Sequence, residues 1–421
     1  MHDRAPARRL LASVLFILLL TACRSSPDVP RQSVAKPPQV TPSPSASATT
    51  RARPTHTPKP TATAAAPATA SPLPPPPTAT VLPSITPSPA PAFPKYDGVP
   101  LLRDEIGVQI HIHREDLRLI MRHLQALDVG WVKAQVSWKL YQPQPGGYDE
   151  DRLAELDALV EAAVNNNIQV LLSVSKAPEW SRATTELDGP PVDYALYHDF
   201  MAFLANRYQG RVAAYELWNE PNLQREWNGT PLNAADLARL ISTGAGGVRQ
   251  ADPQAIVISS APATTGINDG VTAIDDRVFL RGMLDAGIGD IVDGIGVHPY
   301  GWANPPDSSN AAPDPSVPTH NNHPSFFFSD TLSDYEALLA EYSVADQLWV
   351  TEFGWGSFDQ LLDDDGEAAQ PPAGAEFMAE VDEWEQAAYL LRALEMGQLD
   401  DSVGPMIIWN LNFGPLLGDE Y

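Results

Sequence analysis

Short apolar runs alternate with longer stretches of helical periodicity from about residue 100 to the end of the chain. Each run has the length of a buried strand, and the stretches between them have the spacing of helices that cover a core. The pattern predicts strands at 106–112, 131–136, 170–174, 213–218, 255–259, 294–297, 348–351 and 406–409. It predicts helices at 115–127, 151–165, 194–208, 234–250, 276–286, 331–342 and 376–396.

Alternating strands and helices imply a parallel sheet with right-handed crossovers. Eight strands favour an α/β fold of the (β/α)8 TIM-barrel type over an open doubly wound sheet. The first strand contains Ile106-Gly107-Val108 and lacks the G-x-G-x-x-G spacing of a dinucleotide-binding turn. About a dozen residues follow the last predicted strand, too few for an eighth helix, so we expect the sequence to be a fragment that lacks this end of the barrel.

The first 23 residues have the features of a targeting signal. Arg4, Arg8 and Arg9 precede an apolar run at 10–20 that is too short to span a membrane. The run leads into Leu20-Thr21-Ala22-Cys23, which resembles a bacterial lipobox. Cys23 is the only cysteine, so an intramolecular disulfide is excluded. We therefore expect lipidation at Cys23 and an extracytoplasmic, membrane-anchored protein; the alternative is an ordinary signal peptide beside a coincidental cysteine.

Composition separates a linker from a domain. Residues 24–95 hold 20 of the 42 prolines among many Ala, Thr and Ser, which predicts a disordered, partly polyproline-like linker. Residues 96–421 hold all ten tryptophans and carry 17 basic against 51 acidic residues. Such a charge repels polyanions at long range, so we expect no nucleic-acid partner; the alternative is a solvated surface that serves solubility or salt tolerance, and the neutral substrate we expect fits both interpretations.

Chemically active residues follow the predicted strands. The fourth strand runs into Glu220, the sixth into His298 and Tyr300, the seventh into Glu352, and the eighth into Trp409. Barrel enzymes build their sites at these strand ends. Two carboxylic acids are what glycoside hydrolysis needs, one to protonate the leaving oxygen and one to attack the anomeric carbon or activate water. Indoles offer flat faces for sugar rings, and the candidates are Trp138, Trp180, Trp302, Trp355 and Trp409.

Barrel dimensions give a rough distance between the two carboxyl groups. Strands four and seven lie on roughly opposite sides of a barrel about 7–8 Å in radius, which puts inward-pointing carboxyl groups about 6 Å apart. Retaining enzymes have about 5–5.5 Å and inverting enzymes about 6.5–9.5 Å. The estimate leaves the stereochemistry open.

Trp218-Asn219-Glu220-Pro221 and the Thr-Glu-Phe-Gly-Trp segment around Glu352 resemble clan A of the glycoside hydrolases over residues 104–413. Within the clan the sequence is most similar to family 39, on the run from Trp131 to Trp138 and the segment 143–148, with family 5 cellulases close to it.

The resemblance implies a retaining enzyme for β-linked oligo- or polysaccharides, with Glu220 as acid/base and Glu352 as nucleophile. It also implies that Asn219 contacts the sugar 2-hydroxyl, that His298 and Tyr300 flank the glutamates, and that Trp409 floors the cleaved-sugar subsite. Lys133 departs from the arginine that is common on the second strand.

Several residues have competing interpretations. Glu216 points into the barrel and is expected to pair with Lys133. His111 and His113 share a strand face, but no third ligand has fitting spacing, so we predict no metal; His113 lining the sugar site is an even alternative to a structural role.

We expect no cofactor and a monomer. A catalytically silent, glycan-binding surface lipoprotein is the alternative function, and the segment 304–324 is expected to shape the cleft.

Overall fold

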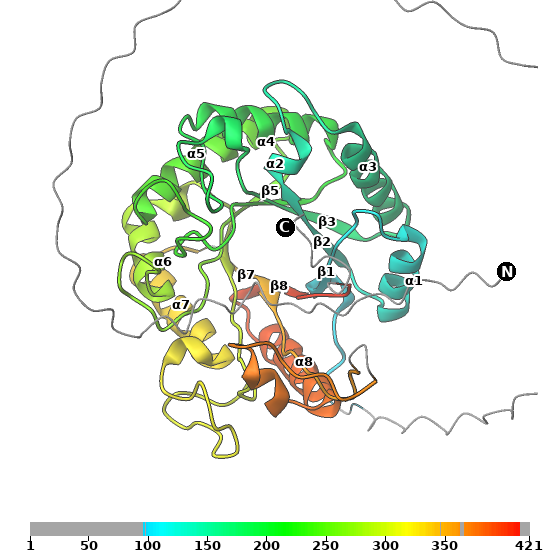
Figure 1. The fold of residues 1–421 in the computed structure, drawn as a ribbon, viewed down its shortest axis with the longest axis vertical. Coiled ribbons are helices and arrows are strands. Elements are labelled where there is room, and N and C mark those ends of the chain that lie inside the picture. Colours follow the sequence, from blue (N-terminus) through cyan, green and yellow to red (C-terminus); the bar gives the residue numbers. More distant parts are fainter. Residues whose placement is uncertain (1–95, 97, 346, 363–365, 413–421) are drawn as a thin grey trace, which may run out of the picture. The chain divides into compact units, whose positions relative to one another are not determined.

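The computed structural model describes residues 96, 98–345, 347–362 and 366–412. Eight parallel strands close into a barrel in the order β1 to β8, each paired with its neighbours in sequence and β1 paired with β8. Helices surround the strands (Figure 1). The TIM-barrel prediction is therefore confirmed. The strands are β1 Ile106–Ile110, β2 Trp131–Ser137, β3 Gln169–Ser175, β4 Ala214–Leu217, β5 Ile256–Ser259, β6 Gly294–Val297, β7 Gln347–Phe353 and β8 Val403–Ile408.

The helices lie between successive strands and cover their outer faces. They are α1 Leu117–Leu127, α2 Trp138–Tyr141, α3 Glu150–Asn165, α4 Ala195–Arg207, α5 Ala234–Ala251, α6 Asp276–Asp285, α7 Phe328–Glu341 and α8 Glu383–Gln398. Short 3-10 turns are at Arg103–Glu105, Glu179–Ser181, Ile288–Asp290, Pro324–Phe326 and Glu376–Glu380.

The largest difference from the sequence prediction is the helix expected at 376–396. The structure has a 3-10 turn at Glu376–Glu380, and the α-helix begins only at Glu383. Asp382 caps that helix by accepting a hydrogen bond from the Glu385 backbone, and the Glu385 side chain accepts one from the Asp382 backbone. This capping box satisfies two backbone N–H groups at the helix start, which sets the start at Asp382.

The barrel interior is layered. Six apolar side chains fill its lower part: Trp131, Leu171, Ala214, Ile258, Trp349 and Ile407. Trp131 and Trp349 meet edge to face with ring centroids 5.2 Å apart. Trp131 begins β2 and Trp349 lies near the start of β7, and both indoles point into the barrel, not toward the helices. They lie inside because residues two positions apart on a strand share a face, and Lys133 and Thr351 on the same strands reach the interior.

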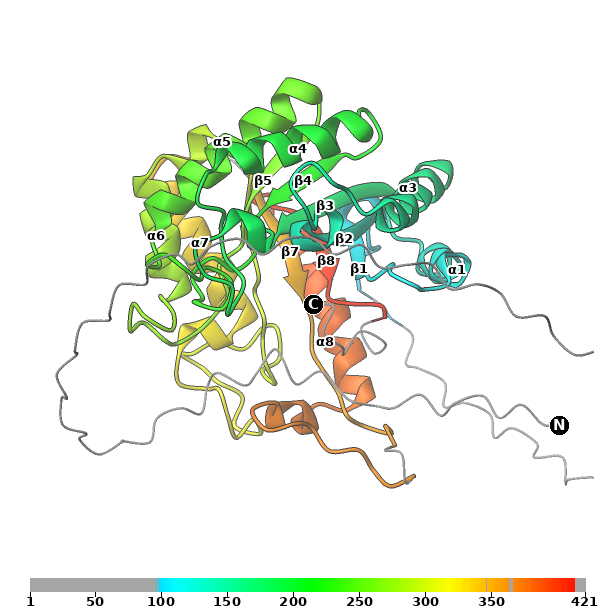
Figure 2. The ribbon, with the colours of Figure 1, turned by 45° about the horizontal axis from the view of Figure 1, so that its top comes forward.

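Two long segments, after β6 and after β7, lie side by side in both ribbon views (Figures 1 and 2). Trp302 stacks on His320 at 4.4 Å, and both rings contact Phe377. Asn304 donates to the His320 and Phe326 carbonyls. The 304–324 segment is therefore held in a defined shape by aromatic packing and backbone hydrogen bonds.

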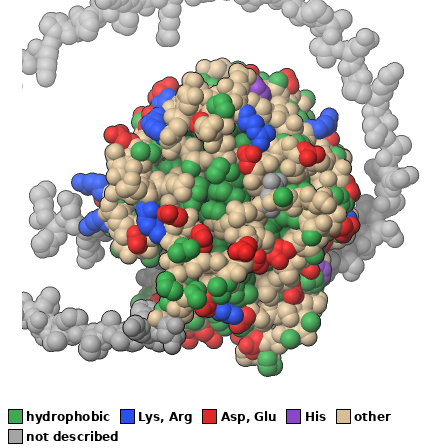
Figure 3. Space-filling model, turned by 180° about the vertical axis from the view of Figure 1, so that it is seen from behind, with side chains coloured by type: hydrophobic (Ala, Val, Ile, Leu, Met, Phe, Trp, Pro, Cys, Tyr) green, Lys and Arg blue, Asp and Glu red, His purple; other side chains and the backbone are tan. Residues whose placement is uncertain are grey.

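The surface seen from behind Figure 1 has acidic and basic side chains spread around a central group of hydrophobic ones (Figure 3). Within the described residues, no helix combines the length and apolar character needed to cross a bilayer. The predicted signal peptide, Cys23, the linker at 24–95 and the region of an eighth helix after Asn412 all lie outside the described residues.

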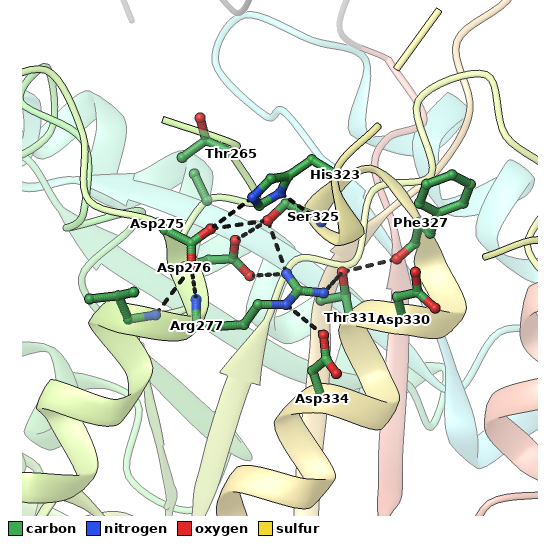
Figure 4. Close-up of polar contacts among 12 residues, drawn as sticks. Thr265, Asp275, Asp276, Arg277, His323, Ser325, Phe327, Asp330, Thr331 and Asp334 are labelled. Carbon is green, nitrogen blue, oxygen red and sulfur yellow. Dashed lines mark hydrogen bonds and ion pairs between the residues drawn. The ribbon is translucent and has the colours of Figure 1, made fainter. Parts of the chain in front are cut away.

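Arg277 joins the start of α6 to the segment that follows β6 and to α7 (Figure 4). Its guanidinium donates to Asp276 at 2.8 Å, to Asp334 at 2.7 Å and to Ser325 at 3.0 Å. Ser325 in turn donates to Asp276 at 2.7 Å. Asp276 is fully buried, and this burial raises its pKa, while the charge of Arg277 opposes the rise and favours the ionised carboxylate.

We predict that Arg277→Met lowers the free energy of unfolding by about 3–5 kcal/mol, because it leaves Asp276 buried without its cation. Arg281→Met is the matched control, since its partner Glu341 is 57% exposed and a surface pair contributes about 0–1 kcal/mol. Urea denaturation of both variants measures the difference. Equal losses for the two variants would contradict the role given to Arg277.

Candidate active site

Glu220 and Glu352 meet at the carboxyl ends of β4 and β7. Their side chains are almost fully buried. One carboxylate oxygen of each lies within 4.8 Å of the other and of a ring nitrogen of His298. The closed barrel brings together these three groups, which are far apart in the sequence. This separation is compact enough for both carboxylates to reach one glycosidic bond.

Glu352 is held by hydrogen-bond donors from β1, from β2 and from the segment after β6. Lys133 of β2 donates to it at 3.0 Å, and the Tyr300 hydroxyl donates at 3.1 Å. Gln109 of β1, with its amide nitrogen turned toward Glu352, donates at 3.0 Å and accepts from the Trp409 indole at 3.2 Å. The second Glu352 oxygen is thereby directed into the site beside Tyr300.

Lys133 is fully buried beneath the two glutamates and contacts Glu216 at 2.9 Å, which confirms the predicted pair. Thr351 donates to the other Glu216 oxygen at 2.6 Å. Burial alone would lower the pKa of Lys133, but the charges of Glu216 and Glu352 outweigh it and raise this pKa. Burial alone would raise the pKa of Glu216, yet Lys133 and His298 bring this pKa below its usual value. Lys133 and Glu216 are therefore both charged at neutral pH.

Glu220 has two basic neighbours. His298 Nδ1 lies 3.3 Å from one oxygen, and Arg225 donates to the other at 2.8 Å. Burial would raise the pKa of Glu220, but the His298 hydrogen bond and the Arg225 charge outweigh it and lower this pKa. Burial likewise would lower the pKa of His298, while the charge of Glu352 and the contact with Glu220 raise it.

The loop after β4 presents Glu220 through an unusual backbone. Trp218 and Glu220 have φ of 80° and 41°, in the left-handed region that side chains rarely adopt. Asn222 compensates by donating to the Ala263 and Ile274 carbonyls and accepting from the Ala263 backbone. Strained conformations of this kind persist where the surroundings fix them, often at functional sites.

Five of the predicted site residues converge on this cluster: Glu220, Glu352, His298, Tyr300 and Trp409. Asn219 lies next to them in the chain and is 6% exposed. Its side-chain oxygen is buried, and no described residue forms a hydrogen bond with it. A buried acceptor of this kind is normally satisfied by water or a ligand.

Two predicted sugar platforms are core residues instead. Trp138 is fully buried in α2, where it stacks on Phe200 and donates to Gln142. Trp355 is 4% exposed and donates to the Asn304 carbonyl, so it anchors the segment after β6. Neither indole offers a free face, because the chain turns inward directly after β2 and β7.

His113 and Trp180 lie at the periphery. His113 pairs with Glu155 of α3 at 2.9 Å, which ties it to the outer helix layer, and its place in the sugar site stays a prediction. Trp180 is half-buried and donates to the Gln142 carbonyl at 3.0 Å. Its contact with a sugar stays a prediction.

Sequence reasoning did not single out Arg225, Glu226 or Gln109. Gln109 shares the first strand with the apolar residues and looked like an ordinary strand residue. Arg225 and Glu226 lie in a loop whose path the sequence does not reveal. Their one sequence signal is position, five and six residues after Glu220.

Among the described residues, Glu220, His298 and Glu352 are the group whose donor atoms could surround a metal ion. The ammonium of Lys133 and the guanidinium of Arg225 already contact these two carboxylates. Two cations at this range oppose a third, so we interpret the group as a hydrogen-bonded acid–base cluster.

Comparisons with known proteins agree with this architecture. A family 39 glycoside hydrolase from Bacteroides cellulosilyticus WH2 superposes with a TM-score of 0.54 at 19% identity, over 75% of this chain and 60% of the other. A glucosidase from Croceicoccus marinus gives a TM-score of 0.51 at 15% identity, over 76% and 62%. The chain thus spans about 60% of the length of these structural relatives, and no curated protein matches it.

The similarity to these structures is a similarity of fold. A family model, in contrast, matches a part of the sequence that contains the site residues. The model for cellulase (glycosyl hydrolase family 5) matches residues 105–381, a range that includes Glu220 and Glu352. Both families expected within clan A are therefore found, family 5 by the family model and family 39 among the similar structures. The chain belongs to glycosyl hydrolase family 5, the cellulase family.

Proposed function

We propose that the protein is a retaining glycoside hydrolase for β-linked oligo- or polysaccharides, with Glu352 as nucleophile and Glu220 as acid/base. The observation that carries the proposal is the close pair of buried carboxylates with different surroundings. Their oxygens lie within 4.8 Å, a separation that supports the roughly 5–5.5 Å arrangement of retaining enzymes over the wider inverting one.

The surroundings of Glu352 suit a nucleophile. Lys133 places a positive charge 3.0 Å from one of its oxygens, and Tyr300 at 3.1 Å and Gln109 fix its orientation. Ionised Glu352 attacks the anomeric carbon and forms a glycosyl ester while the bond to the leaving oxygen breaks.

Glu220 gives its proton to that leaving oxygen and then takes one from the water that hydrolyses the ester. His298, 3.3 Å away, is the neighbour best placed to exchange a proton with it. Asn219, with its buried carbonyl oxygen, supplies a hydrogen-bond acceptor for a sugar hydroxyl beside the acid/base.

We further propose that Cys23 is lipidated and anchors the enzyme outside the cytoplasm, on the evidence of the Arg-rich head, the short apolar run and the Leu-Thr-Ala-Cys sequence. Metabolic labelling with a radioactive fatty acid should mark the protein, and Cys23→Ala should abolish the label. Equal labelling of the variant would exclude this anchor.

We predict that Glu352→Gln lowers kcat by about 10⁴–10⁶-fold, the scale on which covalent enzymes lose activity without their nucleophile. Glu220→Gln should cost about 10²–10⁴-fold on natural glycosides. The assay is a panel of β-linked oligosaccharides and aryl β-glycosides, with the product anomer followed by proton NMR. Glu341→Gln, at the partly exposed surface pair with Arg281, is the matched control.

Retention of configuration by the wild type, lost with Glu352→Gln, is the expected result. An inverted first product would contradict the double displacement. Binding of a glycan without cleavage would instead favour the silent, glycan-holding alternative.

We predict that Lys133→Met lowers the free energy of unfolding by about 3–5 kcal/mol at pH 7, because it leaves two buried carboxylates without their shared cation. The pKa of Glu216 is depressed in the folded protein, so the stability from this pairing is present above about pH 4.3, the unfolded value, and is lost as the pH falls through the folded pKa. The gap between wild type and variant should therefore narrow from pH 7 to pH 3 in urea denaturation. A gap independent of pH would contradict the ion pair.

A further inference from the structure

Arg225 is a neighbour of Glu220 whose permanent charge works against the proposed acid step, as the hydrogen bond from His298 also does. It lies on the loop after β4 and donates to Glu220 at 2.8 Å, and its side chain is 18% exposed. An acid/base must carry a proton before it can release the leaving group. An arginine does not lose its own proton, so at this distance it stabilises the ionised form of Glu220.

Protonation of Glu220 would leave the Arg225 cation without its main partner in a nearly buried place, which is costly. A second carboxylate is present to take that charge. Glu226 Oε1 lies 3.9 Å from Arg225 Nε, and the Glu226 side chain is 13% exposed. One Glu226 oxygen is buried with no hydrogen-bond partner among the described residues. Rotation of the guanidinium toward Glu226 would shorten the 3.9 Å gap to Oε1 and form a direct ion pair with this carboxylate.

The loop itself is fixed, so the movement is confined to side chains. Asn222 anchors the backbone to Ala263 and Ile274. The Trp218 indole donates to the Glu226 carbonyl at 3.1 Å and packs edge to face on Trp227. Glu220, Arg225 and Glu226 are thereby held at fixed Cα positions.

We propose that Arg225 is a positioning residue for the acid/base step, which pairs with Glu220 in the free enzyme and passes to Glu226 when Glu220 is protonated. The inference rests on the proposed function, because it assigns a proton to Glu220. The proton balance is that of the double displacement: Glu220 gives one proton to the glycosidic oxygen as the carbon–oxygen bond breaks and regains one from the attacking water.

The charged and titratable groups around Glu220 set the direction of the expected shifts. His298, Tyr300 and Glu352 face it from β6 and β7, with Lys133 and Glu216 beneath them. Arg225 and Glu226 face it from its own loop. Burial raises the pKa of Glu226, and the charges of Lys176 and Arg225 oppose this rise. Removing the Arg225 charge raises the pKa of Glu220. Removing the Glu226 carboxylate leaves Glu220 as the main partner of the Arg225 charge and lowers the pKa of Glu220.

The test is the pH dependence of kcat/KM for the full chain and for Arg225→Gln, Glu226→Gln and Arg225→Lys. Aryl β-glycosides with a poor leaving group report the protonated acid through the alkaline limb of the profile. We expect this limb to move to higher pH in Arg225→Gln and to lower pH in Glu226→Gln, while Arg225→Lys restores most of the wild-type position. A shift of one pH unit changes the rate on that limb tenfold.

2,4-Dinitrophenyl β-glycosides, whose departure needs no proton, should lack this alkaline limb in all four proteins. Shifts of the two glutamine variants in the same direction, or no shift in either, would overturn the proposal, because a purely structural role predicts lost activity without opposed pH shifts. If Arg225→Gln does not fold, Glu226→Gln and Arg225→Lys still carry the test.

A titration that needs no turnover separates this inference from the proposed function. In protein labelled with carboxyl-¹³C glutamate, the Glu220 signal is assigned by its loss in Glu220→Gln. Its titration midpoint should rise in Arg225→Gln and fall in Glu226→Gln even if no glycoside is cleaved. Cleavage by the wild type with an unchanged Glu220 midpoint in both variants would leave the glycosidase in place and reject the ion-pair exchange.

Discussion

A buried ammonium between two carboxylates organises the mouth of this barrel. Lys133 contacts Glu216 at 2.9 Å, Glu352 at 3.0 Å and the Thr351 carbonyl at 3.1 Å. A charge that is fully buried, as that of Lys133 is, is tolerated only when its partners surround it. Those partners come from β4 and β7, so the pairing requires a closed barrel with these strands at fixed heights. The apolar layer beneath, with Trp131 against Trp349, excludes water from below.

The site pairs three basic side chains with three acidic ones, but the cations beside Glu352 and Glu220 are held in different ways. Lys133, Arg225 and His298 face Glu216, Glu220 and Glu352. Lys133, the cation that contacts Glu352, lies on a strand. It also contacts Glu216, a second carboxylate that is itself fixed by a hydrogen bond from Thr351. The cation of Glu220 stands on a loop and has another carboxylate within 4 Å. The two proposed catalytic carboxylates therefore have different electrostatic surroundings, which is what the proposed two-carboxylate mechanism requires.

The sequence predicted those features that depend on strand order and missed those that depend on loop paths. The strand at Gly294–Val297 and the Lys133–Glu216 pair were predicted because alternation along a strand fixes which side chains point inward. Trp138 and Trp355 were assigned wrongly, because a position just after a strand does not tell which way the chain then turns. Arg225 reaches Glu220 only because Asn222 ties the intervening loop to its neighbours, a tertiary contact without a local signal.

The sequence has Lys133 where an arginine is common on the second strand, which left the contacts beneath Glu352 undetermined. This difference has a physical explanation. An ammonium is compact and directs its donors independently, so it can contact two carboxylates and a carbonyl that approach from different strands. A guanidinium is a larger planar fork and matches one carboxylate edge to edge. Within the fully buried space above the tryptophan layer, the smaller cation lets Glu216 and Glu352 approach the same charge. Glu352, the proposed nucleophile, is therefore fixed from below by Lys133 through one oxygen, while its other oxygen accepts from Tyr300.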